Sequence, residues 1–320
     1  MVLPFAGKPS MSRRVLLAAG ASALAGLTGT SQAQAAGRRF DLTGPPEGLI
    51  WRKPLKDQTV LQSLAFDNRN GHIYTAQVRN GTGSARAGDL CISKLSLNGA
   101  LLGHMYLMGF GHGVQIAVEP VGSAAYLWTE TDGASDRQNA WGRKIARFPF
   151  VSGRTLTTRS PNVTKYAPVP GATSTTCAID PSTNRLVMRY RLSGAVRFTV
   201  YNLDTLKAGR PVALSQAEQP PGLGTFQGYT LYQDHIYLLD GDAYGRANPA
   251  PGNTHLTSVS LLTGQKVERR FTAAAKSLDH REPEGMAIQI AGGQPRLCYG
   301  LAAGRPGTRL VSIVYKSKRA

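Results

Sequence analysis

The sequence predicts an all-β protein, a single five-bladed β-propeller with four-stranded antiparallel blades. Residues 62–74 read as an apolar strand opened by a polar residue, a tight turn, and a second β-branched or aromatic strand. Looser copies of this hairpin follow, so that copies start at residues 62, 112, 175, 227 and 284. A repeat of roughly 50 residues built from strand hairpins is typical of propeller blades. The sequence therefore predicts one blade per copy.

The strands are expected in a regular order over residues 48–318. Residues 36–47 form a polar lead-in, and Leu49-Ile50-Trp51 reads as the strand that closes the ring against the last blade. Each hairpin is followed by an alternating strand, a tight turn and an outer strand. These half-blades are expected at 90–108 around Asn98-Gly99, at 144–151 with Ser152-Gly153, at 196–203 with Asp204-Thr205, at 255–262 with Thr263-Gly264, and at 309–315.

The N-terminus has the features of an export signal. Arg13-Arg14 precede a weakly hydrophobic stretch at 15–27, and Ala33-Gln34-Ala35 has the small-x-small form of a signal-peptidase site. The apolar run is too short and too rich in small residues to span a bilayer. We therefore expect residues 1–35 to be a twin-arginine-type signal peptide. The mature chain is expected to be secreted without a membrane anchor.

The mature chain is expected to be strongly basic. The whole chain carries 37 Lys and Arg against 19 Asp and Glu, a net charge of +18. Loss of Lys8, Arg13 and Arg14 with the signal peptide lowers this charge to +15. Such a field favours anionic partners, namely nucleic acid, acidic lipid or a polyanionic cell-wall polymer. Export argues against nucleic acid, and no interface signal argues against a monomer.

Propeller geometry is expected to gather polar residues at one mouth of the central channel. The innermost strand of each blade starts at that face, and the loop between the second and third strands emerges there. The strand openers are Gln62, His112, Thr175, Gln227 and Glu284. The residues that follow the second strands include Gln77, Glu130, Asp132, Arg189, Arg191, Asp240 and Asp242. Each such residue either contacts a ligand or only hydrogen-bonds a neighbouring blade or a trapped water.

Particular chemistry is suggested at a few of these positions. His112 lies between two glycines, which let a backbone or ligand come close, although a structural histidine fits equally well. Glu284 follows Asp279-His280-Arg281-Glu282, so Glu282 and Glu284 can form an acid–base pair with His280 or His112, or simply a solvated loop. Arg189, Arg191 and Arg281 are candidates to clamp phosphates or carboxylates.

The sequence contains none of the common cofactor-binding or metal-binding motifs. It lacks a Walker loop, an HExxH pair, a serine nucleophile elbow and a dinucleotide fingerprint, so neither a cofactor nor a metal is expected. Ca²⁺ stays open as an alternative, because Asp240-Gly241-Asp242 and Glu130-Thr131-Asp132 supply carboxylates. Cys91, Cys177 and Cys298 lie in predicted strands among apolar neighbours and are expected to be buried free thiols.

Several motifs resemble those of a known group of propellers. They are residues 61–67, Gly111-His112-Gly113, Phe226-Gln227-Gly228 and residues 283–288. They are similar to the secreted actinobacterial propellers called teichoic acid biosynthesis protein C, which group with TagC-like and staphylococcal phage receptor-binding-protein propellers. The resemblance implies a five-bladed propeller that engages teichoic acid or a related glycopolymer, and it supplies no catalytic set. Blade three departs from the pattern with Thr175-Thr176, so a fivefold-equivalent site is not expected.

Two functions of different classes follow as hypotheses. The first is a secreted module that binds an anionic or polyhydroxylated, teichoic-acid-like glycopolymer at the channel mouth. Its ligand-binding residues would be Gln62, His112, Gln227, Glu284, Arg189, Arg191, Asp240 and Arg281.

The second is a carbohydrate-active enzyme in the same channel, with His112 and Glu284 as catalytic candidates. A glycoside hydrolase needs two carboxylates about 5–10 Å apart, such as Glu284 with Glu130 or Asp240. A polysaccharide lyase needs a base and an arginine instead. A third hypothesis, a protein–protein scaffold, predicts exposed apolar patches rather than a polar mouth.

Overall fold

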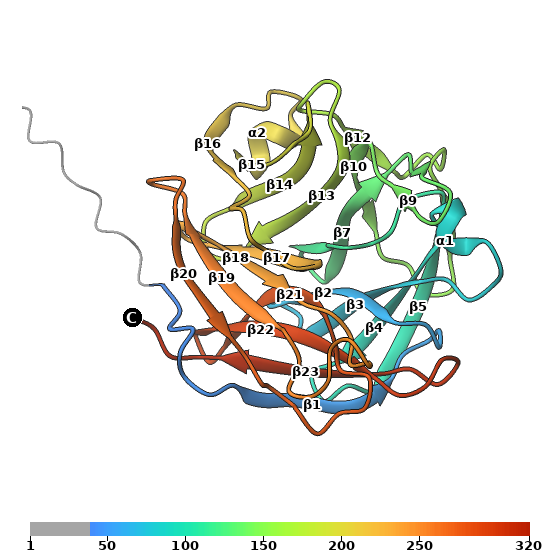
Figure 1. Cartoon of the computed structure of the whole chain (residues 1–320). Coiled ribbons are helices and arrows are strands. Elements are labelled where there is room, and N and C mark those ends of the chain that lie inside the picture. Colours follow the sequence, from blue (N-terminus) through green and yellow to red (C-terminus); the bar gives the residue numbers. More distant parts are fainter. Residues whose placement is uncertain (1–38) are drawn as a thin grey trace, which may run out of the picture. The chain divides into compact units, whose positions relative to one another are not determined.

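Five β-sheets form the blades of a propeller in residues 39–320, the part of the chain that this computed structural model describes (Figure 1). Each blade has four antiparallel strands, as the repeats predict, and the sheet of blade one carries a fifth, parallel strand. The innermost strands of the blades are β2, β6, β13, β17 and β21, which contact one another around the central channel. The expected signal peptide lies outside the described residues.

The strands of the first three blades follow one another along the chain. Blade one contains β2 (Leu61–Asp67), β3 (His72–Val78), β4 (Leu90–Ser96) and β5 (Leu101–Met108). Blade two contains β6 (Ala117–Val121), β7 (Ala124–Thr131), β10 (Lys144–Pro149) and β12 (Thr164–Tyr166). Blade three contains β13 (Thr173–Asp180), β14 (Arg185–Leu192), β15 (Ala195–Asn202) and β16 (Ala213–Glu218).

The last two blades complete the ring, and short elements lie in the connections. Blade four contains β17 (Phe226–Tyr232), β18 (His235–Asp240), β19 (His255–Ser260) and β20 (Lys266–Phe271). Blade five contains β21 (Glu282–Ala291), β22 (Gln294–Ala303), β23 (Leu310–Lys316) and β1 (Glu47–Pro54). The connecting elements are α1 (Ser84–Ala87), β8 (Ala134–Ser135), β9 (Ala140–Trp141), β11 (Thr155–Thr157) and α2 (Leu203–Lys207).

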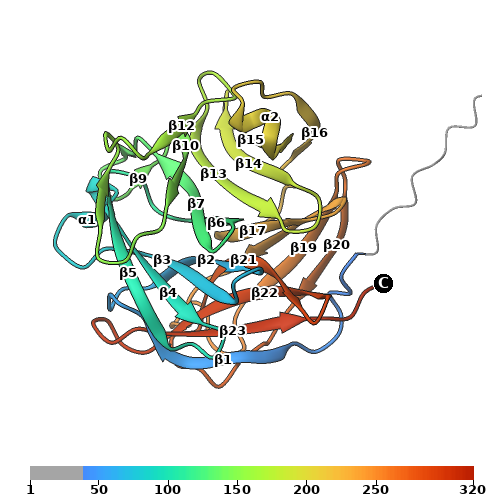
Figure 2. The same ribbon diagram turned by 180° about the vertical axis from the view of Figure 1, so that it is seen from behind.

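The ring closes through the N-terminal strand, as predicted from Leu49-Ile50-Trp51. Strand β1 pairs antiparallel with β23, and the two lie side by side in both views (Figures 1 and 2). This pairing covers the edge of β23 that would otherwise be the outer edge of blade five. The described part of the lead-in also packs on the propeller, because Phe40 and Leu42 are buried against blades four and five. The backbone N–H of Phe40 donates to the hydroxyl of Tyr237 at 2.9 Å.

The local structure differs from the expectation at two turns. The strand after Ser152-Gly153 is β11, which pairs in parallel with β5 of blade one, while the outer strand of blade two is β12. Strand β11 therefore braces two neighbouring blades. The turn expected at Asp204-Thr205 is the first turn of helix α2. The side chain of Asn202 caps this helix by accepting from the backbone N–H groups of Asp204 and Thr205.

Blade two also begins later than its sequence copy suggested. Strand β6 starts at Ala117, not at His112. The segment before it cannot join a ladder, because side chains take its backbone groups. The N–H of Gly113 donates to the carboxylate of Glu130 at 2.6 Å, and its carbonyl accepts from the hydroxyl of Ser63 at 2.6 Å.

The core of the described residues lies between the blades. Five hydrophobic clusters are present, and each draws its side chains mainly from two neighbouring blades. Cys91, Cys177 and Cys298 are free thiols buried in these sheets, as expected. No helix within residues 39–320 is long and apolar enough to cross a membrane.

Candidate functional site

The starts of the innermost strands of blades four, five and one are packed directly against each other. A Cβ atom added to Gly228 would lie 2.8 Å from Cα of Gly285, and one added to Gly285 would lie 2.5 Å from Cα of Ser63. Only glycine permits this approach. The hydrogen bond from Ser63 to Gly113 then joins blade two to the group. The structure thus places the backbone around the strand openers of these four blades at one end of the channel. We call this end, which carries Gln62, His112, Gln227 and Glu284, the opener mouth.

Register shifts mark the same positions in several blades. They fall between Leu61 and Ser63, Thr173 and Thr176, Phe226 and Gly228, and Glu284 and Met286. A β-bulge adds a residue on one strand and redirects its side chain, a device common beside binding sites. The polar openers are therefore part of a repeated backbone irregularity at the mouth.

Gln115 closes the channel beneath the opener mouth. Its side chain is 1% exposed, and its amide Nε2 donates to the carbonyl of Met286 in blade five at 3.0 Å. Its Oε1 accepts from the backbone N–H of Tyr229 in blade four at 3.3 Å. Because blade two is not adjacent to blade four or five, this side chain crosses the axis. It separates the opener mouth from the opposite end of the channel.

The loop between β7 and β10 adds an aromatic ring to the opener mouth. This ring is Trp141, half-buried on β9, and its centroid lies 4.9 Å from that of His112 with 37° between the planes. The indole N–H donates to the carboxylate of Asp136 at 2.6 Å, which fixes the ring orientation. The sequence reasoning missed Trp141. The available signal was a tryptophan set between the small residues Ala140 and Gly142 in a loop otherwise rich in polar residues.

The imidazole of His112 is held neutral at the opener mouth. Burial lowers its pKa to about 4, although the charges of Asp136 and Glu282 act in the opposite direction. Its Nδ1 atom is buried and has no hydrogen-bond partner among residues 39–320. A neutral histidine in this position can accept or donate a hydrogen bond to a hydroxyl group.

The depressed pKa of His112 predicts a loss of stability in mild acid. The unfolded chain binds this proton near the ordinary pKa of 6.5, whereas the folded protein binds it near 4. The free energy of unfolding should therefore fall by up to about 3 kcal/mol as the pH drops through this window. Urea unfolding of wild type and His112→Gln between pH 7 and 4 measures the effect.

The comparison with the variant isolates His112 from other groups. Burial raises the pKa of Glu130 and Glu284, so their contributions are lost as the pH rises and oppose that of His112. We expect wild type to lose more stability than His112→Gln over the acid window. Parallel losses in the two proteins would contradict a buried neutral imidazole.

Glu130 builds the part of the mouth that carries His112 and Trp141. Its side chain is fully buried, and its two oxygens accept from the backbone N–H groups of Gly113 at 2.6 Å and Gly142 at 2.5 Å. A Cβ atom on Gly142 would lie 2.4 Å from Cβ of Glu130, so the loop closes tightly over this carboxyl group. Burial raises the pKa of Glu130 to about 7 against the effect of these donors. Glu130 is a positioning residue, not a channel-facing carboxylate.

Glu284 is a buried carboxyl group near the opener mouth. It is 5% exposed, and its carboxyl group makes no hydrogen bond to any residue in 39–320. Burial, with a smaller effect from the charge of Glu282, raises its pKa well above the ordinary value. Glu282 in turn lies 2.9 Å from Nε2 of His280. In its protonated form, this carboxyl group can both donate to and accept from a sugar hydroxyl.

Two residues that the sequence suggested as ligand-binding, Arg281 and Asp240, lie instead inside the propeller wall. Arg281 is 0% exposed, and its guanidinium donates to the carbonyls of Ala274 and Thr272 and to the hydroxyl of Thr254. Asp240 is 1% exposed and is paired with Arg269, with oxygen–nitrogen distances of 2.5 and 2.7 Å. Their hydrogen-bonding groups are engaged within the protein, so neither can reach a ligand in the channel.

The remaining candidates divide into engaged and available groups. The side chain of Gln227 donates to the carbonyl of Gly241 at 2.9 Å. The guanidinium of Arg189 donates to the side chain of Gln219 and lies 3.8 Å from the ring centroid of Phe226. These two are structural in the described protein. Gln62 makes one long bond of 3.4 Å to the carbonyl of its neighbour. Arg191 is exposed and bonds the carbonyl of Gly194 at 3.2 Å. Gln62 and Arg191 therefore retain capacity for a ligand.

The carboxylates of the two acidic loops, and those suggested as partners of Glu284, are engaged within the protein. The carboxylate of Asp132 lies 3.1 Å from Lys144 and 2.5 Å from Lys165, Asp240 pairs with Arg269, and Glu130 is enclosed by backbone. Residues 39–320 contain no group of three His, Cys, Asp or Glu side chains placed to hold an ion. These contacts do not support Glu130 or Asp240 as the second carboxylate of a hydrolase.

Comparisons with known proteins agree with this architecture. Residues 60–315 match the family model of the phage five-bladed β-propeller receptor-binding platform domain. The chain is 27% identical over 286 residues to the "Putative major teichoic acid biosynthesis protein C" of Bacillus subtilis strain 168, covering 86% of this chain and 63% of that protein. The tail fibre of Staphylococcus aureus phage P68 has the same fold, with a TM-score of 0.69 and 19% identity over 85% of this chain and 52% of the fibre chain.

Proposed function

Because the chain belongs to the phage five-bladed β-propeller receptor-binding platform family, we propose that it binds a cell-wall glycopolymer of the teichoic acid class at its opener mouth. The name of the B. subtilis relative supports this class of polymer. The chain spans only 63% of that relative, so the proposal concerns the propeller alone. The twin-arginine motif and the cleavage pattern support the further proposal that the protein acts outside the cytoplasm.

The observation that carries the proposal is the pairing of Trp141 with hydrogen-bonding groups of neighbouring elements. A tryptophan offers a large, rigid, apolar face, and the apolar face of a sugar or polyol chain can lie against it. His112 lies beside the ring, and Glu282 acts electrostatically on both His112 and Glu284. Imidazole and neutral carboxyl groups can bond hydroxyls in either direction. The mouth thus presents an aromatic face and polar groups of the kind that a polyhydroxylated ligand needs.

Two arginines beside Trp141 supply the positive charge for phosphate. Arg137 lies at the tip of the β8–β9 hairpin, and Arg143 follows Trp141 by two residues. Both side chains are exposed and form no ion pair with a carboxylate of residues 39–320. Guanidinium groups bind phosphate oxygens with paired hydrogen bonds. They replace Arg281 as candidates for recognition of an anionic polymer backbone.

The charge component is tested with Arg137→Glu/Arg143→Glu. We expect the double variant to bind teichoic acid at least about tenfold more weakly at low salt, because two phosphate contacts become repulsive. Its binding should also depend less steeply on salt. Arg210→Glu/Lys266→Glu is the matched control, since both residues are exposed and lie away from the opener mouth. Equal weakening by the two double variants would show that only net charge matters. It would contradict a role of Arg137 and Arg143 in phosphate recognition.

A further inference from the structure

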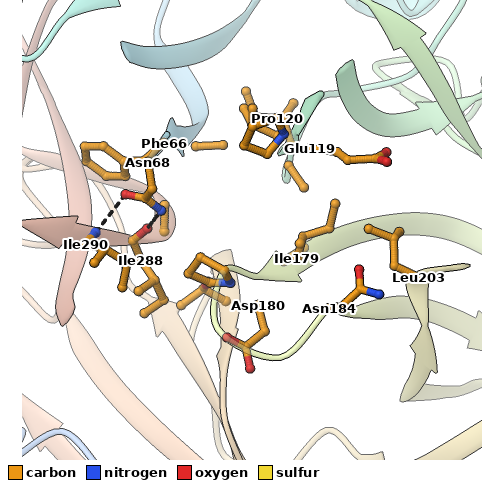
Figure 3. Close-up of a pocket in the computed structure, with 18 of the residues that line it drawn as sticks. Phe66, Asn68, Glu119, Pro120, Ile179, Asp180, Asn184, Leu203, Ile288 and Ile290 are labelled. Carbon is orange, nitrogen blue, oxygen red and sulfur yellow. Dashed lines mark hydrogen bonds between the residues drawn. The ribbon is translucent and has the colours of Figure 1, made fainter. Parts of the chain in front are cut away.

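The end of the channel opposite the opener mouth contains a hollow. It has a volume of about 600 Å³ and lies between residues near the ends of the inner strands of all five blades (Figure 3). Gln115 and Thr230 form part of its lining, and Gln115 separates it from the opener mouth. Its size is that of a small-molecule site. The sequence reasoning placed no site at this end.

The walls of this hollow are apolar, because its polar groups are engaged elsewhere. Phe66, Ile179 and Ile288 are among the lining residues, while the carboxylates of Glu119 and Asp180 point away from the centre (Figure 3). The carboxylate of Glu119 accepts hydrogen bonds from Trp128, Arg147 and Lys207. The carboxylate of Asp180 accepts from the hydroxyls of Ser182 and Thr183 and from the backbone N–H of Gln233.

The amide of Asn68 is also engaged, through Ile288 and Ile290 of blade five (Figure 3). Its Nδ2 donates to the carbonyl of Ile288 at 3.1 Å, and its Oδ1 accepts from the N–H of Ile290 at 2.7 Å. A ligand in this hollow therefore meets mainly hydrocarbon, and burial of its own apolar surface stabilises the complex.

The charge at the rim of the hollow is positive. Arg69 lines it, is exposed, and forms no ion pair within residues 39–320. Lys207 also lines it and is paired with Glu119 and Asp204. Each lining carboxylate already has a basic partner. Glu119 forms ion pairs with Arg147 and Lys207, and Asp180 lies 3.6 Å from Arg185. Arg69 is thus an uncompensated cation beside an apolar wall.

We propose that this hollow binds a single-chain amphiphile with an anionic head group, of the fatty acid or alkyl phosphate class. The hydrocarbon chain would lie against Phe66, Ile179 and Ile288, and the head group would lie at Arg69. The site is independent of the glycopolymer mouth, because Gln115 closes the channel between them. The two ligands should therefore bind without competing.

Calorimetric titration with dodecyl phosphate, kept below its micelle concentration, tests the proposal. Wild type should bind one molecule per chain, and dodecyltrimethylammonium should bind at least about tenfold more weakly. Ile179→Asp should weaken binding of dodecyl phosphate at least about tenfold by placing a charge in the apolar wall. Arg69→Glu should weaken it about fivefold or more through loss of the head-group contact.

Matched substitutions outside the hollow control for surface effects. Leu214→Asp replaces a leucine that is 53% exposed on β16, and Arg210→Glu reverses an exposed charge. Both should bind dodecyl phosphate like wild type, and all variants should keep the wild-type melting curve and teichoic acid binding. Equal affinity of Ile179→Asp and wild type, non-saturable uptake, or equal binding of the cationic amphiphile would overturn the proposal and leave the glycopolymer site untouched.

A competition experiment tests whether fatty acid and alkyl phosphate share this site. Dodecanoate titrated in the same way should compete with dodecyl phosphate if the head-group contact is a simple anion contact at Arg69. Failure of the two to compete would overturn a shared site for the class.

Discussion

Trp141→Ala is expected to weaken binding of teichoic acid at least about tenfold with little change in the free energy of unfolding. The indole ring is half-buried at the end of a short hairpin, so its loss removes a ligand-facing surface and the contact with His112 rather than core packing. Equilibrium binding measured by retention on immobilised polymer, alongside urea unfolding, separates the two effects.

The chain offers a matched control for this substitution. Trp51 is 47% exposed on β1, the outermost strand of blade five. Trp51→Ala should leave binding of the polymer unchanged. If the two tryptophan variants lose affinity equally, or if neither does, the aromatic face of the opener mouth has no part in recognition.

Glu130→Ala is expected to lower the free energy of unfolding by at least about 3 kcal/mol. The substitution leaves the N–H groups of Gly113 and Gly142 buried without acceptors and opens a void where the glycines enclose the side chain. Because these glycines flank His112 and Trp141, polymer binding should fall as well. The free energy of unfolding of Glu130→Gln should lie between those of wild type and Glu130→Ala. Its amide keeps one acceptor oxygen, but its NH₂ group faces the second backbone N–H donor.

An exposed glutamate provides the reference for this measurement. Glu218 on β16 has a side chain that is 72% exposed and pairs with Arg197 at 3.4 Å. Glu218→Ala should change the free energy of unfolding by no more than about 0.5 kcal/mol. A Glu130→Ala protein that unfolds like Glu218→Ala would contradict the role of Glu130 as the support of the mouth.

The fold could be predicted from the sequence because its signals are local and repeated. Each hairpin copy carries its own turn and its own alternation of apolar residues, so the blades follow without knowledge of long-range contacts. Two of the errors occurred where a side chain bonds backbone N–H groups, either across the blade or at the start of a helix. Glu130 binds the segment after His112, and Asn202 turns an expected loop into helix α2.

The candidate site was predicted less completely than the fold. Spacing predicted that the strand openers, Glu284 among them, lie at one end of the channel, but it could not show which polar groups have internal partners. Arg281 and Asp240 look like site residues in the sequence and are buried with partners in the structure. Gln115 and Trp141 were missed, because a side chain that crosses the axis and a ring in tilted contact with His112 depend on contacts between distant elements.

Binding and turnover measured together on purified protein test the central proposal most directly. The protein is incubated with teichoic acid and with neutral and acidic polysaccharides over a range of salt concentrations, and retention, new reducing ends and unsaturated uronate are recorded. We predict retention on teichoic acid that falls steeply with salt, without new products. Absence of retention at low salt would contradict the binding proposal, and product release from any polymer would show that the mouth is catalytic.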